Sequence, residues 1–152
     1  MRIPIYRISS RDHLPQDPAG AARTTEGRWH LLGQRVLYFS SSLALSVLEL
    51  KANAVSFTRI REAYHYSVME VELSKDCESP PPSIYSDQWT RQKRMTQHYG
   101  SGWYLRKNAL VLKVKSAVLP TESNYIVNVA HPDFAALAVS EPNSIPLDPR
   151  LN

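Results

Sequence analysis

The chain has 152 residues, of which 43% are hydrophobic and 21% charged, and its formal net charge is +4 at pH 7. This length is typical of one domain and can bury a sizeable core, and the composition excludes disordered and collagen-like classes. The single cysteine, Cys77, excludes an internal disulfide framework and a multi-cysteine zinc site. The modest positive charge points to an acidic ligand or partner and to nothing more specific.

The first third of the chain carries two strand patterns and one helix pattern. Residues 3–8 are predicted to form a short strand, and residues 11–25, with two prolines and a glycine, a loop. Residues 35–40 are rich in β-formers and are expected to form a second strand. A serine at position 41 or 42 can cap a helix that we predict over residues 43–53.

The remainder of the chain mixes strands with polar connections. Three further strands are predicted, at residues 64–73, 110–119 and 125–129. Residues 87–99 are predicted to form a polar, basic helix that Gly100 and Gly102 end. The proline-rich tail from about residue 141 is expected to be extended or loosely packed. Because strands precede and follow the helices without a regular βαβ rhythm, we predict an α+β fold in a single domain, residues 1–152.

Two residues around the second predicted strand are candidates for ligand contacts. The guanidinium of Arg28, between Gly27 and Trp29, offers donors in a planar fork suited to phosphate or ribose oxygens. The alternative is a surface arginine whose stem packs on Trp29. The ring of Tyr38 is suited to stack on a base or nicotinamide, and the alternative is an ordinary half-buried strand tyrosine.

A carboxylate and a hydroxyl lie within otherwise apolar patterns. Glu49 belongs to a helix that is apolar over most of its circumference, where it shares a polar stripe with Ser42, Ser46 and Asn53. That stripe is suited either to face water or to line a polar cleft. Ser116 shares a strand face with three apolar residues, so it points inward, either to fill a packing gap or to face a site.

Other features indicate no further chemistry. The five histidines have no paired metal-ligand spacing, so we predict no metal site. The basic residues at 91–94 are compatible with nucleic-acid contact, although a solvated helix face is the favoured interpretation. The sequence contains neither a signal peptide pattern nor an apolar segment long enough to span a membrane, so we expect a cytoplasmic protein.

An ordered set of short motifs along nearly the whole chain resembles the RES-domain toxins, the toxin halves of RES–Xre toxin–antitoxin pairs. The matching segments are Tyr6-Arg7-Ile8, Gly20-Ala21-Ala22-Arg23, Gly27-Arg28-Trp29, Val36-Leu37-Tyr38-Phe39-Ser40, Leu43-Ala44-Leu45, Leu48-Glu49, Trp103-Tyr104, residues 114–120, residues 124–128 and His131-Pro132-Asp133-Phe134. By this resemblance Arg28, Glu49 and Ser116 take the positions of the family's Arg, Glu and Ser. Tyr38 matches the family's active-site tyrosine.

The chain departs from the family pattern close to these residues. Glu26, His30 and Lys115 stand where the family usually has Gly, Asn and Pro. No departure removes a named catalytic residue. They bear instead on the shape of the loop near the site and on the detailed substrate contacts.

The resemblance implies an ADP-ribosyltransferase-like fold, with antiparallel sheets that form a cleft and helices that flank it. It implies that the protein binds NAD⁺ as a substrate, without a further cofactor, and cleaves the nicotinamide–ribose bond by hydrolysis or phosphorolysis, which depletes NAD⁺. The residues expected to bind NAD⁺ are Arg28, His30, Tyr38, Ser40 and Asn124. Transfer of ADP-ribose to a protein is the first alternative, and a non-enzymatic nucleic-acid-binding module the second.

The resemblance also assigns roles to the catalytic set and a partner to the chain. Glu49 would stabilise the oxocarbenium-like transition state and orient the attacking water or phosphate. Arg28 would hold the pyrophosphate or a ribose, Tyr38 would stack on the nicotinamide, and Ser116 would hydrogen-bond the ribose or Glu49. The implied partner is an Xre-like helix-turn-helix antitoxin that covers the active site. We expect no membrane and no direct nucleic-acid partner, and a homodimer within the complex stays open.

Overall fold

The computed structural model describes residues 1–12 and 25–152, so most of the predicted loop at 11–25 lies outside the described residues. The strands are β1 (Arg2–Ser10), β2 (Val36–Ser40), β3 (Tyr64–Glu72), β4 (Cys77–Glu78), β5 (Val111–Lys115), β6 (Ser123–Asn128) and β7 (Asn143–Ser144). The α-helices are α2 (Leu43–Ala52), α3 (Phe57–Ala63), α4 (Leu73–Asp76) and α5 (Lys93–Arg106), with 3₁₀ turns η1 (Pro82–Ile84), η2 (Trp89–Arg91) and η3 (Pro132–Ala136). All five predicted strands are present, and the α+β class is confirmed.

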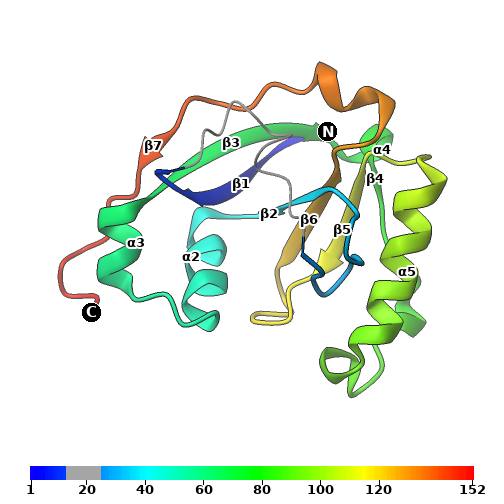
Figure 1. Ribbon diagram of the computed structural model, residues 1–152, viewed down its shortest axis with the longest axis horizontal. Coiled ribbons are helices and arrows are strands. Elements are labelled where there is room, and N and C mark those ends of the chain that lie inside the picture. Colours follow the sequence, from blue (N-terminus) through cyan, green and yellow to red (C-terminus); the bar gives the residue numbers. More distant parts are fainter. Residues whose placement is uncertain (13–24) are drawn as a thin grey trace.

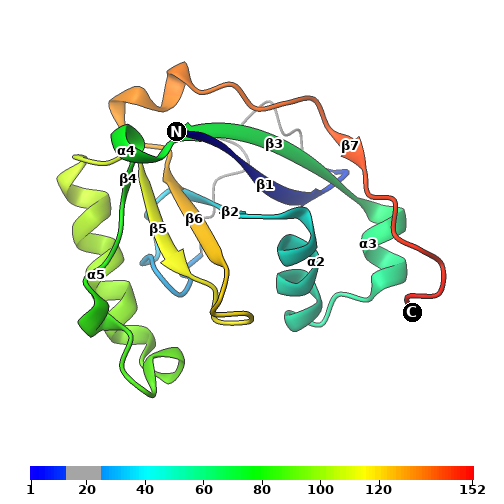
Figure 2. The ribbon, with the colours of Figure 1, turned by 180° about the vertical axis from the view of Figure 1, so that it is seen from behind.

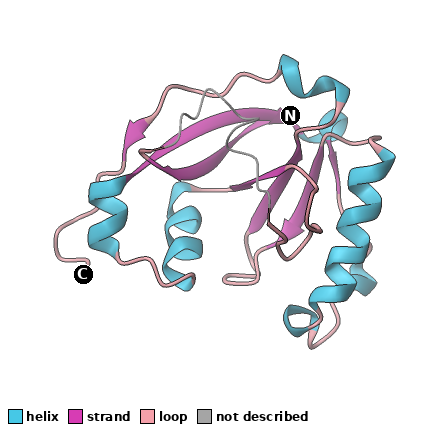
Figure 3. Ribbon diagram, viewed as in Figure 1, coloured by secondary structure: helices cyan, strands magenta, loops and turns pink. Residues whose placement is uncertain are grey.

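The strands form one seven-stranded sheet in the order β4-β5-β6-β2-β1-β3-β7 (Figures 1 and 3). Neighbouring strands are antiparallel except for β4 and β5, which are parallel. The helices α2 and α3 lie below β1 and β3, and α5 flanks the sheet on the side of β4 and β5, as both opposite views show (Figures 1 and 2).

The sheet is split between its two central strands. β1 pairs with β3 along its whole length, whereas it pairs with β2 only where Tyr6 lies opposite Ser40. Beyond that pair β1 and β2 separate, so one half of the sheet (β3 and β7 with β1) angles away from the other (β2, β6, β5 and β4). Residues of both strands line the cleft described below.

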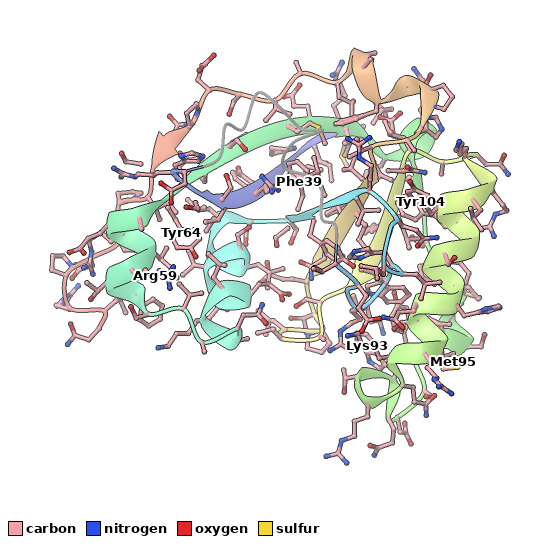
Figure 4. All side chains as sticks on the ribbon, in the orientation of Figure 1. Phe39, Arg59, Tyr64, Lys93, Met95 and Tyr104 are labelled. Atoms are coloured by element: carbon pink, nitrogen blue, oxygen red, sulfur yellow. The ribbon has the colours of Figure 1, made fainter. Side chains whose placement is uncertain are left out.

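The predicted alternation in β2 is confirmed by two separate core clusters. Leu37 and Phe39 pack into a cluster on one face of the sheet, together with Ile5 of β1 (Figure 4 labels Phe39). Val36 packs on the opposite face, in a cluster that contains Trp29 and Trp103 of α5. Each face of the sheet therefore has its own apolar layer, as a strand buried on both sides requires.

The predicted helix at 43–53 is confirmed as α2. The Ser42 hydroxyl accepts a hydrogen bond from the Leu45 amide at 3.0 Å and so caps the first turn. Val47 packs into a third apolar cluster with Ile60 of α3. This packing fixes the rotation of α2 about its axis, and with it the direction in which its polar stripe points.

The predicted helix at 87–99 is wrong at both ends. Its first part is the 3₁₀ turn η2, and α5 begins only at Lys93 and continues through Gly100 and Gly102 to Arg106. Gly100 does not end the helix because it is the point of closest approach between α5 and Trp29. A Cβ atom at Gly100 would lie 2.7 Å from the carbonyl carbon of Trp29, so no larger residue fits there.

The C-terminal tail is extended, but the expectation of loose packing is wrong. Asn143 and Ser144 in β7 pair with the outer edge of β3, and Ile145 is buried in the cluster beneath α2 and α3. The Arg61 guanidinium donates hydrogen bonds of 3.0–3.1 Å to three tail carbonyls. The helix that supplies Arg61, α3, was not predicted, although Ser56 caps it.

Candidate active site

A cleft of about 590 Å³ opens where β1 and β2 separate. Its walls come from β1, β2, β6, α2, the segment before β2, the first residue of α5 and the end of β5 with the loop that follows. Five of the seven predicted site residues line it: Arg28, Tyr38, Ser40, Glu49 and Asn124. The volume lies within the range of roughly 300–1,000 Å³ found for sites that bind small molecules and cofactors.

Three of the four residues of the polar stripe on α2 line this cleft, whereas the fourth, Ser42, lies outside it. Ser46, Glu49 and Asn53 are all part of its wall. The Ser46 hydroxyl also donates a hydrogen bond to the carbonyl of Tyr6 at 3.2 Å, which ties α2 to β1. Periodicity left open a solvated face or a cleft wall, and the structure shows a cleft wall at Ser46 and Glu49, while Asn53 at the end of the stripe is also exposed to solvent.

The Glu49 carboxylate is held through one of its two oxygens. Oε1 accepts hydrogen bonds of 2.7 Å from the Ser116 hydroxyl and 2.7 Å from the Asn124 side-chain amide. Such hydrogen bonds to a charged acceptor are stronger than neutral ones and fix its geometry. Within residues 1–12 and 25–152, no group donates to Oε2, so this oxygen is left for a ligand in the cleft.

Ser116 lies behind Glu49 and is fully buried. Its hydroxyl donates to Glu49 and accepts hydrogen bonds from the amides of Val118 and Leu119 at 3.1 and 3.0 Å. One donor and two acceptor positions of the hydroxyl are thus all used. Of the roles implied for Ser116, the geometry supports the bond to Glu49 and leaves no hydrogen for a ribose.

Ser40 and Asn124 form a second line of support for the carboxylate. The Ser40 hydroxyl donates to the side-chain oxygen of Asn124 at 3.0 Å, which directs the Asn124 amide nitrogen toward Glu49. The two residues face each other on neighbouring strands β2 and β6. Both were predicted as contacts to NAD⁺, and both line the cleft, but their observed hydrogen bonds position Glu49.

Tyr38 lies on the cleft wall with its hydroxyl anchored from behind. The Tyr38 oxygen accepts a hydrogen bond from the Trp29 amide at 3.2 Å and lies 2.9 Å from Nδ1 of His30. The His30 ring is fully buried and bonds to the carbonyl of Thr25 through its other nitrogen. His30 was predicted as a contact to NAD⁺, but it does not line the cleft and lies behind Tyr38, in contact with the tyrosine hydroxyl.

The rings of Tyr38 and His30 leave no room for a side chain at position 27, which Gly27 occupies. A Cβ atom at Gly27 would lie 2.8 Å from the Tyr38 hydroxyl oxygen and 2.7 Å from Cε1 of His30. Because the His30 ring is enclosed, it cannot move aside. We expect Gly27→Ala to lower the free energy of unfolding by about 1–3 kcal/mol, the usual cost of overpacking.

Chemical denaturation of Gly27→Ala, Tyr38→Phe and the double variant checks this prediction. Tyr38→Phe removes the oxygen that the new methyl group meets, so the double variant should be more stable than the sum of the single effects. Additive effects of the two substitutions would contradict the steric explanation.

Arg28 lies on the cleft wall, in a segment whose backbone is hydrogen-bonded by side chains of α5. The Thr96 hydroxyl donates to the Arg28 carbonyl at 2.6 Å, and the Gln97 amide donates to the Gly27 carbonyl at 2.9 Å. The Arg28 guanidinium donates to the Thr90 carbonyl at 2.8 Å and lies 5.7 Å from the ring centroid of Trp89. Arg28 thus lines the cleft and packs on an aromatic ring, but that ring is Trp89 and not the neighbouring Trp29 of the sequence-based alternative.

Three cationic residues of the cleft were not among the predicted site residues. Arg7 of β1, Lys93 of α5 and Lys115 of β5 all line it. Signals for them were present, because Arg7 belongs to the first matched motif and Lys93 to the basic segment at 91–94. That segment forms no single helix face, since it is divided between η2 and α5.

The described part of the chain offers little other chemistry. Burial raises the pKa of the Cys77 thiol to about 11, which makes it a poor nucleophile. Residues 1–12 and 25–152 contain no cluster of three His, Cys, Asp or Glu side chains suited to a metal ion. None of the helices in these two ranges combines the length and the apolar character needed to span a membrane.

The split sheet with its flanking helices defines a mixed α+β fold that encloses a cleft. A chain of the MbcT–MbcA toxin–antitoxin complex of M. tuberculosis has a similar structure, with a TM-score of 0.71 and 16% identity over 95% of this chain and 85% of that chain. Residues 4–148 match the RES domain, and the chain belongs to this family.

Two relatives match over nearly the full length of both chains. "Toxin Res" of Yersinia enterocolitica is 28% identical over 152 residues, which cover 97% of this chain and 98% of the relative. "Prs ADP-ribosylating toxin" of Sphingobium sp. is 28% identical over 160 residues, which cover 99% and 98% of the two chains.

Proposed function

We propose that this chain is the toxin of a toxin–antitoxin pair and that it binds NAD⁺ in the cleft and cleaves the nicotinamide–ribose bond. The observation that carries the proposal is the Glu49 carboxylate, which Ser116 and Asn124 hold through one oxygen on the wall of a cleft of about 590 Å³. Membership of the RES family and the names of the two relatives support the toxin assignment.

The chemistry of the cleaved bond fits a single oriented carboxylate. When the C–N bond breaks, its electron pair passes to the pyridinium nitrogen, and nicotinamide leaves as a neutral molecule. No proton has to be supplied to the leaving group, and positive charge develops on the ribose. The free oxygen of Glu49 stabilises that charge electrostatically, and the Tyr38 ring stacks on the nicotinamide.

The acceptor of the ribose decides between hydrolysis, phosphorolysis and protein modification. Water yields ADP-ribose, inorganic phosphate yields its 1″-phosphate, and a protein side chain yields a covalent adduct. The name of the Sphingobium relative favours ADP-ribosylation of a protein as the second candidate function. All three reactions use the same first step and the same carboxylate.

Nicotinamide release from NAD⁺ by the purified protein, with and without phosphate, tests the proposal. Release in both buffers indicates hydrolysis, and release that needs phosphate indicates phosphorolysis. Transfer of label from adenine-labelled NAD⁺ onto protein, in a lysate, indicates ADP-ribosylation. A folded sample that gives none of these results would overturn the proposal.

We further propose an antitoxin partner that covers the cleft. The chain similar in fold comes from a toxin–antitoxin complex, and the resemblance of the sequence points to a helix-turn-helix antitoxin. Two large apolar side chains on elements that flank the cleft, Leu48 and Val118, are about 40% exposed. Co-expression with a helix-turn-helix antitoxin of this family should restore growth and suppress NAD⁺ loss, and growth arrest that no such antitoxin relieves would contradict this partner.

Removal of the Ser116 hydroxyl should reduce both activity and stability. In Ser116→Ala, Glu49 keeps only the Asn124 donor, and the amides of Val118 and Leu119 lose their acceptor. Each buried group without a partner costs about 1–3 kcal/mol, so a clear fall in the denaturation midpoint is expected. A loss of about 1.4 kcal/mol of transition-state stabilisation would lower the rate of nicotinamide release about tenfold.

Denaturation and nicotinamide release of Ser116→Ala are compared with those of Ser83→Ala. Ser83 is exposed in η1 and serves as a matched control that should behave as the wild type. Wild-type activity in Ser116→Ala would show that the bond to Glu49 has no role in the reaction.

A further inference from the structure

A row of positive side chains follows one wall of the cleft. Arg28, Lys93 and Lys115 all line this wall, whereas the opposite wall is formed by α2. Of the described residues that line the cleft, only Glu26 and Glu49 are acidic. Glu49 keeps its negative charge while Ser116 and Asn124 donate to it, so the four cations of the lining, with Arg7 of β1 as the fourth, outnumber the two carboxylates.

Two of these cations rest on a pair of aromatic rings. The Lys115 ammonium lies 4.8 Å from the ring centroid of Tyr85, and the Arg28 guanidinium lies 5.7 Å from that of Trp89. The two rings contact each other edge to face, with centroids 5.1 Å apart. The Tyr85 hydroxyl also accepts a hydrogen bond from the Lys115 amide at 3.1 Å. Cation–π contacts of this kind restrain long side chains before a ligand arrives.

The third cation stands at a helix N-terminus. Lys93 is the first residue of α5, at the lower end of that helix in Figure 4, and its ammonium lies 3.7 Å from the Glu26 carboxylate. The first turn of α5 has no acidic residue and no side-chain cap. The positive end of the helix dipole therefore adds to the charge of Lys93.

We infer that Lys93 and Lys115 act with Arg28 as a diphosphate-binding wall, which makes the site selective for dinucleotides. This inference rests on the proposed function, in which the nicotinamide ribose of NAD⁺ lies at Glu49 and Tyr38. The diphosphate is the anionic part of that substrate, and three cations, two of them resting on aromatic rings, complement its two negative charges. Nicotinamide riboside, which lacks phosphate, gains nothing from the wall.

Calorimetric titration with ADP-ribose tests the wall without requiring catalysis. Lys93→Met and Lys115→Met keep the aliphatic stem but remove the charge, and each should weaken ADP-ribose binding by about three- to tenfold, the range for partly exposed charge-assisted contacts. Lys113→Met is the matched control, because Lys113 lies on the same strand as Lys115 but outside the cleft lining. It should bind ADP-ribose as the wild type does.

Two further measurements distinguish a loss of diphosphate contacts from general damage to the site. Glu26→Gln removes the acid beside Lys93 and should tighten ADP-ribose binding about two- to threefold, an effect of opposite sign that is typical of a surface charge. In steady-state assays the lysine variants should raise the KM for NAD⁺ by the same factor as the ADP-ribose Kd and leave cleavage of nicotinamide riboside unchanged.

The outcomes for the wall and for the proposed function can be told apart. Unchanged ADP-ribose affinity in both lysine variants, or no ADP-ribose binding by the wild type, overturns the wall even if NAD⁺ is cleaved. Weaker binding in both variants, in a protein that neither releases nicotinamide nor transfers label to protein in a lysate, supports the wall and overturns the proposed function.

Discussion

Glu49→Gln should lower the rate of nicotinamide release from NAD⁺ by about 10²–10³-fold, the usual effect of removing one preorganised electrostatic partner of a transition state. The substitution is nearly isosteric. The glutamine oxygen can still accept hydrogen bonds from Ser116 and Asn124, so the fold and the site geometry should persist. Only the negative charge next to the ribose is lost.

The measurement is nicotinamide release by purified protein, together with growth arrest on expression in cells. Glu62→Gln, an exposed glutamate on α3 outside the cleft, is the control and should match the wild type. Circular dichroism should show equal folding of all three proteins. A fully active Glu49→Gln protein would remove Glu49 from the mechanism, and a fully active Glu49→Ala protein would do so even more directly.

Gly100→Ala should lower the free energy of unfolding by about 3 kcal/mol, the upper end of the usual range for overpacking. The added Cβ would meet the Trp29 carbonyl, and backbone atoms cannot rotate away as a flexible side chain can. Because α5 also holds the segment around Arg28, the same substitution should displace that residue from the cleft wall.

Gly102→Ala is the matched control on the same helix. Its Cβ would meet only the end of the Arg106 side chain, at 3.1 Å, and alanine favours a helix over glycine by about 0.5–1 kcal/mol. We expect thermal unfolding to show a midpoint roughly 6–12 °C lower for Gly100→Ala and one equal to or slightly above the wild type for Gly102→Ala. Equal midpoints for the two variants would contradict the close approach of α5 to Trp29.

The local patterns were sufficient where a segment's own side chains decide its structure. The cap at Ser42 and the apolar periodicity after it predicted α2 nearly to the residue, and the alternation in β2 predicted the faces of Val36 and Phe39. The same patterns failed for α5. From the sequence, Gly100 is predicted to end the helix. In the structure it lies inside α5, where the absence of a side chain allows the helix to approach the Trp29 backbone.

Some residues of the candidate site could be predicted from the sequence, and others could be recognised only in the structure. The resemblance pointed to Arg28, Tyr38, Glu49 and Ser116 from motif order alone, and the structure brings Glu49 and Ser116 into direct contact. The roles of Ser40, Asn124 and His30 could not be predicted, because each depends on a hydrogen bond to a residue on another element or loop. The cationic wall was missed because its members lie on three separate segments.

Periodicity states which residues share a face, since side chains repeat every two residues in a strand and every 3.6 in a helix. It does not state what that face meets. Ser46 and Glu49 of the stripe on α2 face a cleft because β1 and β2 pair at one position and then separate. Glu49 meets Ser116 across 67 residues and Asn124 across 75. Contacts over such separations follow from how the sheet and helices pack, and so only the tertiary structure decided them.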